Sequence, residues 1–90
     1  MNKIILDSKD FSNINELHSV LKEKLQLPEY YGKNLDALWD CLTGWIELPM
    51  TIEWVGYESS KSILGDYAIK LLETFQDAEQ EIEGFNLIIM

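Results

Sequence analysis

Residues 34–45 of the chain read NLDALWDCLTGW. Asn34 is a favoured residue type immediately before a helix, and Thr43-Gly44 is a favoured place for a helix to end. Between them, apolar side chains recur every three or four positions, which is the spacing of one helix face. That face comprises Leu35, Leu38, Cys41 and Leu42. The stretch therefore predicts a helix that needs a second layer to cover its apolar side.

Three short segments outside this helix have the composition of β-strands. Residues 3–7, 50–54 and 85–90 are each rich in Ile, Leu, Thr or aromatic side chains. The runs Ile4-Ile5-Leu6 and Leu87-Ile88-Ile89 are continuously apolar, which is typical of strands in a sheet with both faces covered. We therefore expect helices on both faces of the sheet.

Helical patterns fill the segments between the strands. Asn13 and Glu16 form a capping box ahead of a helix that stops at Leu27-Pro28. A short helix is predicted over residues 59–64, and Asp66 is expected to cap a further helix over residues 67–83. The resulting order is β-α-α-β-α-α-β, and helical crossovers favour a parallel sheet. The sequence thus predicts a single α/β domain over residues 1–90, a three-stranded parallel sheet with packed helices.

The chain carries a strong negative charge. It has 16 Asp and Glu residues against 7 Lys and Arg residues, and its formal net charge is −9. Residues 1–33 hold five lysines and five acidic residues, so the whole excess lies in residues 34–90. An acidic surface repels polyanions and attracts basic surfaces. We therefore expect a basic protein partner and no direct contact with nucleic acid.

The sequence also indicates a cellular compartment. Cys41 is the single cysteine, so no disulfide can form within the chain, which fits a reducing compartment. The start of the chain holds too few apolar residues for a signal-peptide core. No apolar run approaches the roughly 18 residues that a membrane-spanning helix needs. We expect a cytoplasmic protein with no membrane partner that is a monomer when free.

The outward side of the helix over residues 34–44 carries Asp36, Asp40 and Thr43. Like charges four residues apart destabilise a helix by roughly a few tenths of a kcal/mol. The helix dipole offsets this at Asp36, near the N-terminus, but not at Asp40. Exposed aromatic side chains beside unpaired carboxylates are typical of a binding hot spot, although a plain solvated face also fits. The aromatic residues next to this stripe are Tyr30, Tyr31, Trp39 and Trp45.

Catalysis is a second interpretation of the same residues. Asp36 and Asp40 form a general acid–base pair only if a pocket desolvates one of them. Cys41 and His18 would suit a nucleophile and its base, but both lie at apolar positions of their helices, which favours packed residues. No spacing of ligands predicts a metal site. We therefore expect no catalytic residues, no metal and no cofactor.

The block from residue 27 to residue 45 is also similar to a known family. Leu27-Pro28-Glu29-Tyr30-Tyr31-Gly32, followed by residues 34–45, closely resembles the barstar family of intracellular inhibitors of the bacterial ribonuclease barnase. The strong similarity runs from about residue 13 to residue 54, and a weaker one continues to the last strand. This resemblance implies the fold predicted above and a ribonuclease inhibitor that binds one-to-one and occludes the enzyme's active site.

The resemblance also implies which residues bind the partner. Asp40 would occupy the site of an RNA phosphate, Asp36 would pair with a basic group beside it, and Tyr30 would stack on the enzyme's catalytic histidine. Asp77 would reach a basic side chain at the rim. Lys33 and Asp77 both replace glutamates of the best-known family member. The other implied contact residues are Asn34, Leu35, Trp39, Thr43, Gly44 and Trp45.

The implied partner is a basic, barnase-type extracellular ribonuclease. The alternative is an acidic adaptor or regulatory module that uses the same helix to bind a basic protein that is not a nuclease. Both functions need an exposed acidic helix face, so the residues alone leave both open.

Overall fold

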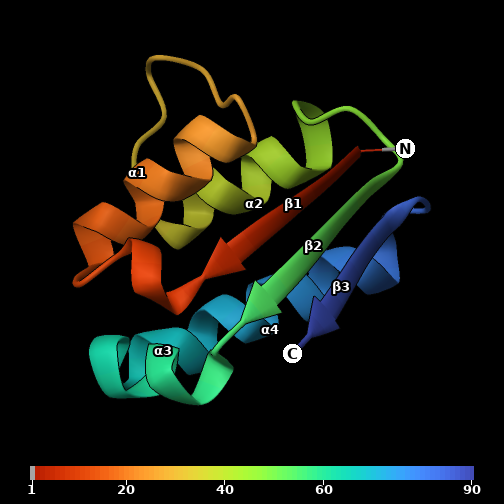
Figure 1. Ribbon diagram of the computed structural model, residues 1–90. Coiled ribbons are helices and arrows are strands. Elements are labelled where there is room, and N and C mark those ends of the chain that lie inside the picture. The colour runs from red at the N-terminus through yellow and green to blue at the C-terminus, as the bar shows by residue number, and fades with distance from the viewer. Residues whose placement is uncertain (1) are drawn as a thin grey trace.

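The structure is a computed structural model that describes residues 2–90 (Figure 1). Its strands and helices follow the predicted order, β-α-α-β-α-α-β. The elements of this part of the chain are β1 (Asn2–Asp7), the 3₁₀ turn η1 (Ser8–Asp10), α1 (Ile14–Lys24), α2 (Leu35–Gly44), β2 (Met50–Val55), α3 (Tyr57–Leu64), α4 (Asp66–Glu81) and β3 (Phe85–Ile89).

The three strands form one parallel sheet with β2 in the centre (Figure 1). The register aligns Ile4 of β1 with Ile52 of β2, and Ile52 with Leu87 of β3. Parallel neighbours cannot be joined by a tight turn, so α1 and α2 connect β1 to β2, and α3 and α4 connect β2 to β3. The predicted three-stranded parallel sheet is confirmed.

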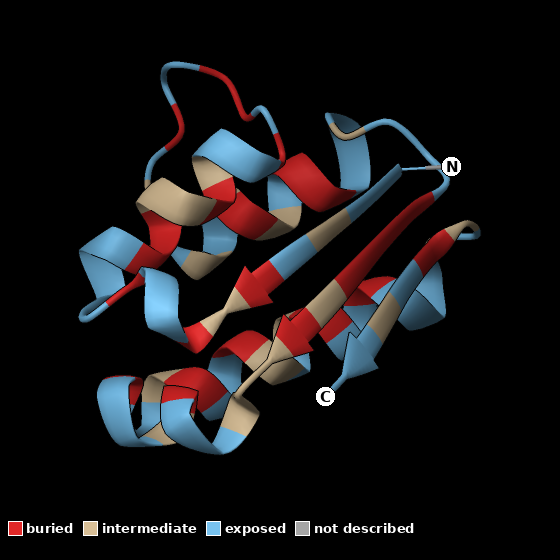
Figure 2. Ribbon diagram, viewed as in Figure 1, coloured by how far each residue is buried: buried red, intermediate tan, exposed pale blue. Residues whose placement is uncertain are grey.

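The prediction that both faces of the sheet are covered is wrong. Trp54 points toward the helices and is fully buried, whereas Ile5 and Ile88 point the other way and are each 44% exposed. On this open face, Lys3 forms an ion pair with Glu53 at 3.2 Å. Figure 2 shows exposed segments along β1 and β3, whereas β2 is mostly buried. The strand order is β1-β2-β3, so both crossover connections step across the sheet in the same direction. Because such connections are right-handed, both lie on the same side of the sheet.

The hydrophobic core lies between the sheet and the helical layer. Trp54 is its largest fully buried side chain, and its indole Nε1 donates a hydrogen bond to Ser60 Oγ at 2.9 Å. The ring of Phe75 on α4 meets Trp54 edge-on, with 6.0 Å between centroids, a favourable aromatic geometry. Leu38 and Leu42 supply the buried side of α2. The core therefore fixes both α2 and α4 against the sheet.

Several helix ends differ from the predictions. α3 begins at Tyr57, two residues earlier than expected, because Gly56 adopts a left-handed conformation with φ of 77° that starts the helix. Asp66 is the first residue of α4, and the cap is Gly65, with no side-chain hydrogen bond. The turn η1 was not predicted. No helix within residues 2–90 combines the length and the apolar character needed to cross a membrane.

Candidate functional site

The exposed side of α2 forms the centre of the candidate site. The side chain of Asn34 accepts a hydrogen bond from the Ala37 amide at 2.8 Å, so the predicted cap is confirmed. Asp36, Asp40 and Thr43 are all exposed, as the helical periodicity predicts. Leu38, Cys41 and Leu42 are buried, and Leu35 is half-buried at the helix start. Because its other side is packed in the core, α2 is a rigid support for this stripe.

The carboxylates of the candidate site, on α2 and α4, have no cationic partner within residues 2–90. The four ion pairs in this part of the chain join other residues, so Asp36, Asp40 and Asp77 remain unpaired. Thr43 Oγ1 is directed back to the helix, where it donates to the Trp39 carbonyl at 2.9 Å. Asp36 and Asp40 are therefore free to accept hydrogen bonds from another molecule.

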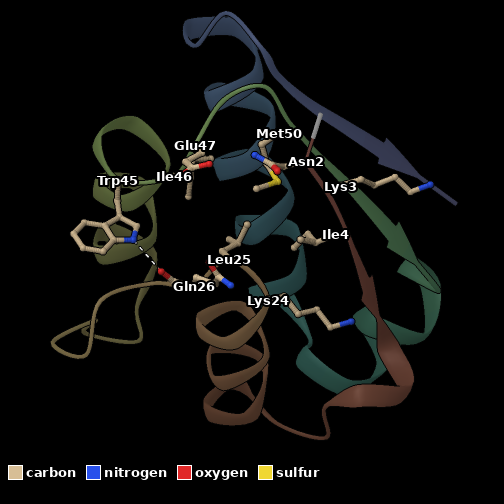
Figure 3. A pocket seen from close by; sticks show the side chains of 10 residues that line it. All are labelled: Asn2, Lys3, Ile4, Lys24, Leu25, Gln26, Trp45, Ile46, Glu47 and Met50. Carbon is tan, nitrogen blue, oxygen red and sulfur yellow. Dashed lines mark hydrogen bonds between the residues drawn. The ribbon is translucent and has the colours of Figure 1, made fainter.

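Two aromatic side chains form a corner beside this stripe. Tyr30 is 81% exposed and Trp45 is 49% exposed, and their rings meet edge-on with 6.5 Å between centroids. The indole Nε1 of Trp45 donates to the Gln26 carbonyl at 3.0 Å, which ties the end of α2 to the loop before it (Figure 3). No sequence pattern indicates Gln26, because its contribution is a backbone carbonyl. Exposed aromatic rings that are already held in place lose little entropy on binding.

Two of the predicted aromatic residues are less exposed than expected. Tyr31 is only 7% exposed, so its assignment to the exposed aromatics is wrong. Its hydroxyl lies 2.6 Å from His18 Nδ1, inside the core. Trp39 is half-buried against the core, so only part of its ring is exposed beside the stripe. The exposed aromatic area of the site therefore comes from Tyr30 and Trp45, with a partial contribution from Trp39.

Lys33 and Asp77 lie at the margins of the site. Lys33 adopts a left-handed backbone conformation with φ of 53°, and its Nζ donates to Ser19 Oγ on α1 at 3.1 Å. Its ammonium group is therefore held against α1. Asp77 is exposed on α4, a helix that packs against α2. Gly44 is exposed at the end of α2, with open space around its Cα.

Two hollows on the surface of the described residues lie apart from the acidic stripe of α2. A hollow beside Trp45 has Lys3, Lys24, Gln26 and Ile46 among its lining residues (Figure 3). A second hollow lies beside α1. Neither contains Asp36 or Asp40, which lie exposed on the surface of α2. Among residues 2–90 no group of three or more His, Cys, Asp and Glu side chains is placed to hold a metal ion.

Cys41 and His18 are packed residues, as predicted from their apolar positions. Burial, followed by the charge of Asp40, raises the pKa of the Cys41 thiol, so little of the reactive thiolate is present at neutral pH. Burial, followed by the charge of Lys33, lowers the pKa of His18 to about 4. His18 is fully buried and has tyrosine hydroxyls at both ring nitrogens.

The fold and this surface together define a small α/β protein that presents an acidic helix and an aromatic corner. The chain matches the family described as "Barstar (barnase inhibitor)" over residues 1–89. It is also 53% identical over 90 residues to "Putative ribonuclease inhibitor YrdF" of Bacillus subtilis (strain 168), with 99% of each chain covered. The chain belongs to the barstar family, so the resemblance read from residues 27–45 is confirmed.

Proposed function

We propose that this protein is an inhibitor, not an enzyme, and that it binds one-to-one in the active site of a basic barnase-type ribonuclease. Family membership and the name of the Bacillus subtilis relative support the ribonuclease as partner class. The observation that carries the mode of binding is Asp40, an exposed carboxylate with no cationic partner within residues 2–90, on a helix whose other side is fixed in the core.

The chemistry of a ribonuclease active site suits this carboxylate. Such a site holds phosphates and is therefore lined by cationic and hydrogen-bonding groups. A carboxylate accepts several charge-assisted hydrogen bonds there, in the place of a phosphate. The helix is rigid before binding, so little entropy is lost when Asp40 enters the site. In this proposal Asp40 occludes the active site by mimicking RNA.

The surrounding residues complete the proposed interface. Asp36, four residues before Asp40, would pair with a second cation, and Asp77 on α4 would reach the rim. Tyr30 and Trp45 would supply the aromatic contact area. The rest of the contact surface would be formed by Asn34, Leu35, Trp39, Thr43 and Gly44. The net charge of −9 would speed the encounter with a basic enzyme and make it sensitive to salt.

The proposal is tested by titrating the protein into a barnase-type ribonuclease assay at low and at raised salt. We expect stoichiometric inhibition that weakens as salt increases. Asp40→Ala should weaken binding by about 2 kcal/mol or more, which is the general threshold for interface hot spots. That loss corresponds to roughly a 30-fold higher dissociation constant. The unfolding free energy of the Asp40→Ala variant should change little, because Asp40 is exposed.

Glu81→Ala is the matched control, because it also removes one exposed carboxylate, at the end of α4. It should change the dissociation constant by less than about threefold, as expected for a charge that acts only through the long-range field. If Asp40→Ala binds as tightly as the parent, or if Glu81→Ala weakens binding equally, the assigned role of Asp40 is wrong. The proposal also places the inhibitor in the cytoplasm, where Cys41 stays reduced.

A further inference from the structure

A buried histidine joins three separate elements of this protein. His18 of α1 is fully buried, and its Nδ1 lies 2.6 Å from the hydroxyl of Tyr31, in the loop between α1 and α2. Its Nε2 lies 2.6 Å from the hydroxyl of Tyr67, in the first turn of α4. Tyr67 is 49 residues from His18 in the chain. The three side chains therefore connect the loop to α4 across α1.

Tyr31 is the aromatic anchor of that loop. Of its neighbours, Glu29, Tyr30 and Gly32 are exposed, whereas the Tyr31 ring is buried. The loop has no regular hydrogen-bond ladder, and the Tyr31 amide donates only within a turn, to the Pro28 carbonyl at 2.9 Å. The position of the Tyr31 ring therefore determines where Tyr30, the next residue toward the N-terminus, stands beside α2.

The three groups form one directional chain of hydrogen bonds. The lowered pKa keeps His18 neutral at pH 7, and a neutral imidazole has one N–H donor and one acceptor nitrogen. One tyrosine hydroxyl must therefore donate to the ring and the other must accept from it. The hydrogen-bond partner at one ring nitrogen determines which of the two nitrogens carries the proton. It therefore also determines whether the second nitrogen donates or accepts its hydrogen bond. Tyr67 in this way sets the bond between His18 and Tyr31.

We propose that Tyr67 and His18 are positioning residues for the partner-binding face, because the chain Tyr67–His18–Tyr31 holds the loop so that Tyr30 is presented against Trp45. This inference rests on the proposed ribonuclease inhibition for its effect on affinity, but its structural part applies to the free protein. Neither Tyr67 nor His18 touches the partner in this mechanism. Both act through Tyr31 on the exposed ring of Tyr30.

The first test uses the free protein and the variant Tyr67→Phe, which removes only the hydroxyl. The readout is the NMR cross-peaks between the ring protons of Tyr30 and Trp45, whose centroids lie 6.5 Å apart. These cross-peaks should weaken in the variant at a temperature where it is fully folded. Tyr57→Phe is the matched control, since Tyr57 is a half-buried tyrosine whose hydroxyl has no hydrogen-bond partner within residues 2–90, and it should leave the cross-peaks unchanged.

The second test measures inhibition of a barnase-type ribonuclease. Tyr67→Phe should raise the dissociation constant by about 3- to 10-fold, the factor that corresponds to one neutral hydrogen bond. In a Tyr30→Ala background the same substitution should change it by less than about twofold, because the residue through which it acts is gone. A general loss of stability in Tyr67→Phe would raise the dissociation constant by the same factor whether or not Tyr30 is present.

Two results would overturn the positioning role. One is a full-intensity contact between Tyr30 and Trp45 in folded Tyr67→Phe. The other is an equal loss of affinity with and without Tyr30. If the parent protein itself inhibits no barnase-type ribonuclease, the proposed function fails, and the ring contact in the free protein then decides the positioning role by itself.

Discussion

Acidification from pH 7.5 to pH 4 should destabilise this protein through His18. The pKa of His18 falls from an ordinary value of 6.5 to about 4 in the folded state, mainly because the ring is buried. The unfolded chain therefore binds a proton in the window between these two values while the folded chain does not. Where the unfolded state binds more protons than the folded state, lowering the pH decreases the free energy of unfolding. The contribution of neutral His18 is thus complete above pH 6.5 and is lost progressively down to pH 4.

The magnitude follows from the size of the pKa shift. The pKa of His18 falls from 6.5 to about 4, and a difference of one in pKa corresponds to about 1.36 kcal/mol. Integrated downward from pH 7.5, this effect lowers the free energy of unfolding by about 2 kcal/mol at pH 5 and by about 3 kcal/mol at pH 4. This is a large share of the 5–15 kcal/mol or so that stabilises a typical domain.

The assay is urea unfolding of the parent and of His18→Gln at several pH values between 4 and 7.5. A glutamine side chain has both an acceptor and a donor for Tyr31 and Tyr67, but it does not titrate. The carboxylates that titrate near pH 4 are common to both proteins, so the difference between the two pH profiles isolates His18. We expect the parent to lose about 2 kcal/mol more than the variant by pH 5. Parallel profiles would refute a buried neutral His18.

Three further predictions concern the core and the thiol. Ser60→Ala should cost about 1–3 kcal/mol in urea unfolding, because it leaves the buried indole N–H of Trp54 without its acceptor. Gly56→Ala should cost more than about 1 kcal/mol by the same measurement, since φ is 77° and the new Cβ would clash with Ser8 Oγ; a stability equal to that of the parent would exclude this strain. Cys41 should react with a thiol reagent at neutral pH far more slowly in the native protein than in urea, because burial raises its pKa; equal rates would contradict its packing.

Local sequence patterns predicted the elements that carry their own signals. α2 has its cap at Asn34 and a periodic apolar face, and both are contained within residues 34–44, so its bounds and its exposed stripe were predicted from the sequence. The same holds for the buried positions of Cys41 and His18. Resemblance to the barstar family added the assignment of Asp40 to a partner's phosphate site, which no local pattern contains.

Features that depend on distant parts of the chain were not predictable in this way. Ile4-Ile5-Leu6 is apolar at every position, but strand order decides which face the helices cover, and Ile5 is exposed. Tyr30 and Tyr31 are adjacent and identical in type, and no periodicity distinguishes them in a loop. Tyr31 is buried, and its hydroxyl lies at hydrogen-bond distance from His18, which also contacts Tyr67. These contacts join residues that are far apart in the sequence.

The open face of the sheet makes this protein suitable for attachment to a sensor surface. Asn86 of β3 is exposed there, next to Thr51 in the register. Because the native thiol at Cys41 is buried, a cysteine introduced as Asn86→Cys would be the reactive one. A tether or fluorophore at that position would lie on the face of the sheet opposite to the core, in which α2 buries its apolar side. The acidic helix would then face the solution in one uniform orientation.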